Sequence, residues 1–284
     1  MKIKVVVILG PTAVGKSDFA VEYARKHNGE VISADSRQVY KELNIGTGKI
    51  TRKEMRGVPH YLLDIADPRK SYSVVKFVED AEKAIADIHT RGKLPVICGG
   101  TGFYIQALVD GIILPNVPPD EKLRKKLARI SPAQLIALLK KLDPERLRKL
   151  DPRNIRRIIR AIEIATTLGK VPKLKKSSGK YAKYAPTFIG LRMAPDILKE
   201  RIKVRLDKRL AAGMVKEAKR LHAEGLSWKR MNSLGLEYRY LALYLQNKMT
   251  LEEMREKLAT EIWHYARRQM TWFRKDKRIR WVMK

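Results

Sequence analysis

A glycine-rich segment near the start of the chain has the residue types and spacing of a phosphate-binding loop. Residues 10–17 read Gly-Pro-Thr-Ala-Val-Gly-Lys-Ser and match the pattern G-x-x-x-x-G-K-[ST]. In such a loop the glycines let backbone N–H groups face phosphate oxygens, Lys16 reaches the terminal phosphates and Ser17 can hold Mg²⁺. The motif predicts a diphosphate or triphosphate site, without saying whether the phosphate is transferred or leaves. Its expected contacts are Gly10, Thr12, Ala13, Val14, Gly15, Lys16 and Ser17.

A carboxylate is expected beside this loop. Asp35 follows the short apolar run 31–33, which predicts a strand, and ligand crevices in open α/β sheets lie at the carboxyl ends of strands. There Asp35 can act as a metal ligand or as a general base, or it can cap the following helical turn. The local sequence leaves capping and catalysis open.

A second glycine-rich loop, Gly99-Gly100-Thr101-Gly102, follows the predicted strand 94–98. No acidic residue stands directly after this strand, where a nucleotide hydrolase often has an aspartate for its magnesium, and this weakens an ATPase interpretation. Cys98, the single cysteine, is expected to be a buried small residue. The five histidines show no metal-ligand spacing, so no structural zinc is expected.

These segments need a parallel sheet to bring them together. Apolar runs at 4–9, 31–33, 94–98 and 187–191 predict strands, while 17–26 and 77–91 have helical spacing. This alternation predicts an α/β fold, a P-loop-containing parallel β-sheet core flanked by helices. Basic helical stretches with Asp-Pro breaks begin near residue 118, residues 169–186 are expected to form a loop or hairpin, and 196–284 look helical nearly throughout. We therefore expect a core of 1–117 and 187–284, with a mainly helical insertion at 118–186 and a helical C-terminal region.

The charge of the chain is uneven. Of 284 residues, 61 are Lys or Arg and 30 are Asp or Glu, which gives a net charge of +31. Residues 1–110 carry 17 basic and 13 acidic groups, net +4, and residues 111–284 carry 44 and 17, net +27. Such an excess is expected either of a surface that binds a polyanion or of solvated lysine-rich helices.

The composition also limits the class of protein. A hydrophobic content of 44% is enough to bury a core, and one cysteine cannot form an internal disulfide, so we expect a cytoplasmic protein. The five apolar residues before Gly10 are too short for a signal-peptide core or a membrane span.

Together, eight ordered segments resemble the tRNA dimethylallyltransferases (tRNA isopentenyltransferases) of bacterial type. Two of them are Asp-Ser-Arg-Gln-Val-Tyr at 35–40 and Arg-Arg-Gln-Met-Thr-Trp-Phe-Arg at 267–274. The others are residues 10–17, 45–49, 59–65, 99–102, 157–163, and Arg201-Ile202 with Arg205. Two places depart from the family's usual pattern: 234–238, which read Leu-Gly-Leu-Glu-Tyr, and Trp263-His264.

The resemblance implies a reaction and a set of roles. The phosphate loop would hold dimethylallyl diphosphate with Mg²⁺, and the prenyl group would go to N6 of adenosine 37 in the tRNA anticodon loop. Asp35 would be the general base, Thr101 would orient Asp35 or the amine, and Arg205 would stabilise the leaving diphosphate. The flipped adenine would meet Gln38, whose amide offers a donor and an acceptor. Expected tRNA contacts are Asp35, Ser36, Arg37, Gln38, Thr101, Arg156, Arg157, Arg160, Arg267, Arg268 and Gln269.

Two other classes compete with this interpretation: a P-loop small-molecule kinase that uses ATP, and an RNA-binding GTPase-like module. A kinase does not explain the net +27 of residues 111–284, and the chain has no Asn-Lys-x-Asp guanine motif. A monomer is expected because a surface of like charge repels its own copies.

Overall fold

Two compact units make up the chain in a computed structural model that describes residues 2–176 and 183–284. Residues 2–111 and 183–284 form the larger unit, and 112–176 form the smaller one. The insertion expected at 118–186 therefore differs at both ends. Ile112 pairs in a small sheet with Lys176, and Tyr184 already pairs with Ile3 in the main sheet, so hydrogen bonding sets boundaries that composition did not reveal.

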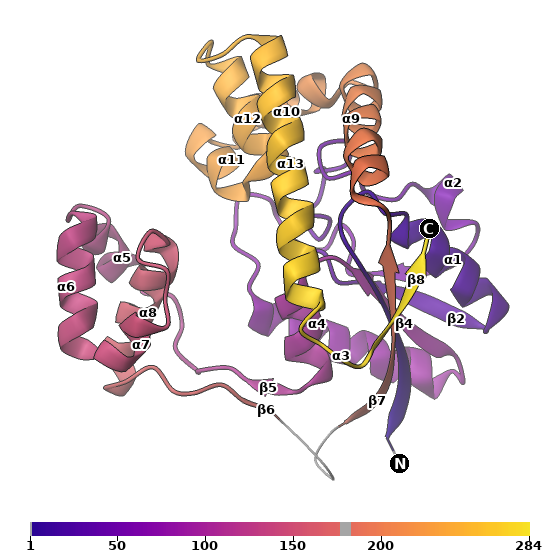
Figure 1. The fold of residues 1–284 in the computed structure, drawn as a ribbon, viewed down its shortest axis with the longest axis horizontal. Coiled ribbons are helices and arrows are strands. Elements are labelled where there is room, and N and C mark those ends of the chain that lie inside the picture. Colours follow the sequence, from indigo (N-terminus) through magenta and orange to yellow (C-terminus); the bar gives the residue numbers. More distant parts are fainter. Residues whose placement is uncertain (1, 177–182) are drawn as a thin grey trace. The chain divides into compact units, whose positions relative to one another are not determined.

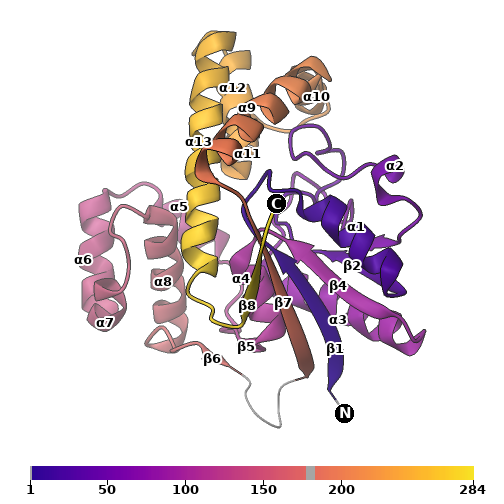
Figure 2. The same cartoon turned by 45° about the vertical axis from the view of Figure 1, so that its right-hand side comes forward.

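The larger unit is built on a parallel sheet. Within the described residues this sheet has six strands in the order β3-β2-β4-β1-β7-β8. They are β1 (Ile3–Leu9), β2 (Gly29–Ser33), β3 (His60–Tyr61), β4 (Leu94–Gly99), β7 (Tyr184–Arg192) and β8 (Ile279–Met283). Each neighbouring pair is parallel, and Figures 1 and 2 show helices on both sides of these strands. The predicted α/β fold with a P-loop sheet core is confirmed.

Alternate residues of β1 enter different hydrophobic clusters, as a two-residue side-chain period requires. Val6 and Ile8 pack with α1 (Lys16–Lys26) and with C-terminal helices. Val5, Val7 and Leu9 pack with α3 (Val74–Thr90) and α4 (Gly102–Val109). Because both faces of the sheet are covered, the strand is continuously apolar, which made it easy to predict.

The C-terminal helices follow the carboxyl end of β7. They are α9 (Pro195–Ala211), α10 (Met214–Ala223), α11 (Trp228–Leu234), α12 (Leu236–Leu245) and α13 (Leu251–Phe273). Figure 1 shows α9 to α12 gathered at the end of the sheet where β7 leads into α9. The long helix α13 begins with a capping box between Thr250 and Glu253. Among the described helices, none is both long and apolar enough to cross a membrane.

The expectation that 196–284 is helical nearly throughout is wrong for its last residues. Ile279–Met283 form β8, which pairs with β7 from Phe188↔Ile279 to Arg192↔Met283. Trp281 lies against Gly190, where a Cβ atom would come within 2.7 Å of the indole ring. Pairing with β7 therefore decides the conformation of a short segment that has no strong pattern of its own.

The smaller unit is mainly helical. Its helices are α5 (Glu121–Leu127), α6 (Pro132–Leu142), α7 (Pro144–Arg148) and α8 (Ile155–Leu168), and β5 (Ile112–Ile113) pairs with β6 (Lys175–Lys176). Leu135, Leu139, Ile158 and Ile162 are buried in its core. At the predicted Asp-Pro break, Asp143 caps α7 by accepting from the Arg146 N–H at 2.8 Å. The loop or hairpin expected at 169–186 lies partly outside the described residues.

Candidate active site

The phosphate loop joins β1 to α1 and depends on two glycines. Gly10 has φ 147°, and a Cβ there would lie 2.5 Å from the Leu191 carbonyl oxygen of β7. Gly15 caps α1 with φ 95°, a left-handed conformation that favours glycine. The loop therefore turns tightly over the carboxyl end of the sheet and places Lys16 and Ser17 at the start of α1.

A cavity of about 220 Å³ lies beside this loop. Its walls come from the loops after β1, β2 and β4, from the loop before α2 (Arg52–Met55), and from α9 and α13. Of the residues predicted from sequence, it is lined by Thr12, Ala13, Gly15, Lys16, Ser17, Asp35, Gln38, Arg205 and Gln269. The structure therefore brings together predicted residues that lie up to 257 positions apart in the chain.

Two partly buried cations, Lys16 and Arg205, contribute to the electrostatic character of this cavity. Burial lowers the pKa of Lys16 to about 8, although the nearby Asp35 carboxylate acts in the opposite sense. Burial also lowers the pKa of Arg205, and the neighbouring Arg209 and Arg201 act in the same direction. Among the described residues, no carboxylate forms an ion pair with Lys16 or Arg205. A polyanion in the cavity would supply the missing counter-charge.

Asp35 caps a turn and also lines the cavity, so its position is compatible with both roles that the sequence left open, capping and catalysis. Its Oδ1 accepts from the backbone N–H of Arg37 at 2.7 Å and of Gln38 at 3.2 Å, which fixes the turn after β2. The same carboxylate lines the cavity. No hydrogen bond to Oδ2 is found within residues 2–176 and 183–284, so that oxygen remains able to accept a proton from a ligand.

Thr101 connects the loops after β2 and β4. Its Oγ1 accepts from the Ser36 N–H at 3.1 Å, and its own N–H donates to the Ala34 carbonyl at 3.3 Å. Tyr265 of α13 lies near Thr101. Tyr265 lines the cavity and was not predicted. The pKa of Tyr265 is raised, chiefly by burial and then by the charge of Asp35, so its hydroxyl stays protonated.

Gln269 joins α13 to the loops that follow β1 and β4. Its Oε1 accepts from the Thr12 N–H and its Nε2 donates to the Gly100 carbonyl, both at 2.8 Å. Gln269 is buried, with 7% of the residue exposed. Both ends of the amide are thus engaged within the chain, and the predicted contact of Gln269 with tRNA stays a prediction.

The remaining predicted residues lie elsewhere. Gly10 and Val14 shape the loop without lining the cavity, and the Arg37 guanidinium donates to the Ser36 carbonyl at 3.1 Å. Arg267 and Arg268 are exposed on α13. On α8 of the smaller unit Arg156 and Arg157 are exposed, whereas Arg160 donates to the Val117 carbonyl at 2.8 Å and pairs with Glu163.

Cys98 is buried, as expected. Burial raises the pKa of its thiol to about 12, although the Lys16 charge acts in the opposite direction. A thiol with this pKa is not a nucleophile at neutral pH.

The fold and the cavity define the chain as a P-loop α/β protein in which a phosphate loop shares one cavity with basic side chains, among them Lys16 and Arg205, and with the Asp35 carboxylate. A family model described as IPP transferase matches residues 38–276. The chain is 41% identical over 280 residues to a tRNA dimethylallyltransferase of Anoxybacillus flavithermus, covering 98% of this chain and 89% of the relative. It is 43% identical over 285 residues to tRNA dimethylallyltransferase 2 of Treponema denticola, covering 98% and 95%.

Solved structures agree with these sequence matches. A tRNA isopentenylpyrophosphate transferase from Bacillus halodurans superposes with a TM-score of 0.75 at 39% identity, covering 99% of this chain and 90% of that one. A eukaryotic dimethylallyltransferase acting on tRNA superposes with a TM-score of 0.83 at 30% identity, covering 99% and 74%. The chain belongs to the tRNA dimethylallyltransferase family, and the resemblance read from its sequence is confirmed.

Proposed function

We propose that this chain transfers a dimethylallyl group from dimethylallyl diphosphate to N6 of adenosine 37 in tRNA and releases diphosphate. The supporting relatives are named for this activity, and the chain spans 85 to 95% of their length. The observation that carries the proposal is the cavity itself, where the partly buried Lys16 and Arg205 lie with the Asp35 carboxylate. Cations without carboxylate partners suit a diphosphate, and the carboxylate suits a nucleophile that must lose a proton.

The donor side of the reaction needs charge stabilisation. As the C1–O bond of dimethylallyl diphosphate breaks, negative charge grows on the diphosphate, and Lys16, Arg205 and the amides of the phosphate loop stabilise it. The Thr12 N–H already donates to Gln269, so these amides come from the later residues of the loop. The C–O electron pair leaves with the diphosphate.

Mg²⁺ is part of this proposal, and the donor set fits it. Within residues 2–176 and 183–284, no group of three or more His, Cys, Asp or Glu side chains could hold a metal by itself. Mg²⁺ commonly keeps phosphate oxygens and waters among its ligands and needs only one or two from the protein. The Ser17 hydroxyl at the cavity wall is suited to be one of these. When bound, Mg²⁺ would neutralise charge on the leaving diphosphate.

The acceptor side needs a base. The exocyclic amine of adenine attacks C1 of the donor, an N6–C1 bond forms, and one N6 proton passes to the Asp35 carboxylate. A stacked base cannot reach the cavity, so adenosine 37 would be flipped out of the anticodon loop. Arg37, Gln38 and the exposed arginines of α8 and α13 are our candidates for contacts to the anticodon stem-loop.

The test uses the whole chain with Mg²⁺, labelled dimethylallyl diphosphate and a tRNA that carries A36 and A37. We expect label on A37 and none on the same tRNA with G37. Label transferred from ATP to a small molecule, without prenyl transfer to tRNA, would replace this function with that of a kinase. We further propose that the enzyme is a cytoplasmic monomer, which sedimentation measurements and cell fractionation can check.

A further inference from the structure

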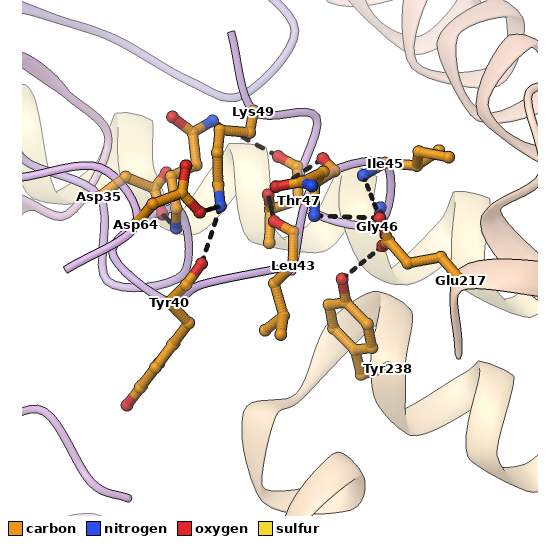
Figure 3. Close-up of polar contacts among 12 residues, drawn as sticks. Asp35, Tyr40, Leu43, Ile45, Gly46, Thr47, Lys49, Asp64, Glu217 and Tyr238 are labelled. Atoms are coloured by element: carbon orange, nitrogen blue, oxygen red, sulfur yellow. Dashed lines mark hydrogen bonds and ion pairs between the residues drawn. The ribbon is translucent and has the colours of Figure 1, made fainter. Parts of the chain in front are cut away.

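An irregular loop at residues 44–49, Asn-Ile-Gly-Thr-Gly-Lys, forms part of the cavity wall through Thr47 and Gly48. We call it the 44–49 loop. It belongs to no strand or helix. Two backbone hydrogen bonds close a turn within it, from the Gly48 N–H to Ile45 and from the Lys49 N–H to Asn44, and its other backbone groups need partners from elsewhere in the fold. Figure 3 shows where these bonds come from.

Glu217 of α10 holds the start of this loop. Its Oε2 accepts from the N–H groups of Asn44 at 3.1 Å and Ile45 at 2.7 Å, and its Oε1 accepts from that of Gly46 at 2.9 Å. Glu217 is buried, with 7% of the residue exposed. Three consecutive amides around one buried carboxylate form charge-assisted bonds that an uncharged side chain cannot reproduce.

Tyr238 of α12 completes this arrangement. Its hydroxyl donates to Glu217 Oε1 at 2.7 Å, as Figure 3 shows, and its ring lies against Gly46, where a Cβ atom would come within 2.7 Å of it. Burial, followed by the charge of Glu217, raises the pKa of Tyr238 well above its usual value, so the hydroxyl remains a donor. Tyr238 lies in the segment where the sequence departs from the usual family pattern.

The other end of the loop holds Gln38. The Gln38 Nε2 donates to the carbonyls of Gly48 at 3.2 Å and Thr47 at 3.4 Å. Carbonyl oxygens can only accept hydrogen bonds, so these two neighbours fix the NH₂ end of the Gln38 amide toward the loop. The Oε1 atom of Gln38 is then the end that can accept a hydrogen bond from a ligand. An acceptor at this position suits a base edge that carries an amino group.

We propose that Glu217 and Tyr238 are positioning residues for the transfer reaction. They hold the 44–49 loop, and the loop orients the Gln38 amide toward the acceptor base. This role rests on the proposed function, because it assumes that an adenine amino group enters the cavity. Neither side chain lines the cavity, so both act through the loop.

A double-mutant cycle tests the role. With dimethylallyl diphosphate saturating, we expect Glu217→Gln to lower kcat/KM for tRNA about tenfold and Tyr238→Phe to lower it about threefold. In a Gln38→Ala background, each loss should shrink to less than about twofold, because the residue that the loop orients is then gone. The Kd of inorganic diphosphate, which probes the phosphate loop, should change less than about twofold.

Glu30→Gln is the matched control. Glu30 is also buried and hydrogen-bonded, but at the amino end of β2, to the side chains of Arg91, Lys93 and Tyr61. Its substitution should lower Tm and leave kcat/KM for tRNA unchanged below the transition. Equal losses for Glu217→Gln with and without Gln38, or a loss confined to Tm, would overturn the positioning role. Absence of prenyl transfer by the unmodified chain would instead overturn the proposed function.

Discussion

The cations of the cavity and those of the smaller unit are chemically alike but placed differently. In the cavity, Lys16 and Arg205 are partly buried without an ion-paired carboxylate among the described residues, and their pKa values are lowered. In the smaller unit, Arg124 lies 2.7 Å from the buried Glu163, whose Oε2 is 3.3 Å from Arg160. Cations that the fold leaves uncompensated are available to a ligand, whereas paired cations mainly stabilise the fold.

The comparison also changes the meaning of the net charge. Residues 112–176 carry 18 basic and 6 acidic groups, net +12, yet their position decides what each can do. Arg124 and Arg160 serve a buried carboxylate, while Arg157 faces solvent. A charge count therefore overestimates the number of groups that can contact RNA.

The largest effect is expected at Asp35, one of the acidic residues that line the cavity. Asp35→Asn keeps an oxygen that can accept from the Arg37 and Gln38 N–H groups, but it cannot take the N6 proton. We expect kcat to fall about 10²- to 10⁴-fold while tRNA affinity stays nearly constant. Single-turnover rates and filter binding measure the two quantities.

Asp35→Ala is the companion variant, because it removes both the base and the turn anchor. Its Tm should fall further than that of Asp35→Asn. Near-normal turnover in Asp35→Asn would show that Asp35 only caps the turn.

Lys16→Met removes a partly buried charge with little change in side-chain length. Transition-state stabilisation of the diphosphate is lost, and kcat/KM for dimethylallyl diphosphate should fall about 10²- to 10³-fold. The free protein should keep or raise its Tm, because it no longer buries a cation. A marked loss of Tm would contradict the assignment of Lys16 to a ligand rather than to the fold.

Lys16 also predicts a pH dependence of stability. Its folded pKa, about 8, lies below its unfolded value of about 10.4. Between these values the unfolded chain binds more protons than the folded one, so this group makes the free energy of unfolding rise with pH from about 8 to about 10.4. If Lys16→Met is more stable than the unmodified protein, its advantage in Tm should therefore shrink as the pH rises from about 8 to about 10.4.

Glu163→Gln should lower stability and leave ligand binding unchanged, which is the opposite of the effects expected for Lys16→Met. It leaves Arg124 and Arg160 without their shared carboxylate, and since both are about one-third exposed, we expect a loss of about 1–3 kcal/mol in unfolding free energy. The loss should appear as faster hydrogen exchange in 112–176. Diphosphate affinity should be unchanged; a parallel fall would mean that the paired charges also serve the cavity.

The smallest effect separates Arg157 from Arg160. Arg157→Ala should weaken tRNA binding several-fold and reduce the slope of log K against log salt by about 1, without a change in Tm. Arg160→Ala, its control, should lower Tm because its bonds to Glu163 and Val117 are lost. Identical salt slopes for both variants and the unmodified chain would show that these arginines of α8 do not contact tRNA phosphates.

Local pattern predicted the parts of the site that depend on neighbouring residues. The phosphate loop is specified by eight contiguous residues, because its glycines and its helix start are local requirements. The buried strands of the sheet were equally accessible through their apolar runs. β8 was missed because pairing with β7 determines its conformation, and Tyr265 was missed because its approach to the cavity depends on how α13 packs.

The sequence by itself determined the phosphate chemistry, the α/β class and, through eight ordered segments, the family. It could not decide which side chains are already used inside the fold. Gln269, predicted as a tRNA contact, also joins Thr12 to Gly100, and Glu217 gave no local signal although it binds three loop amides. Only the tertiary structure settles such cases, because a hydrogen-bonding group is engaged or available according to which distant atoms the packing brings within about 3 Å.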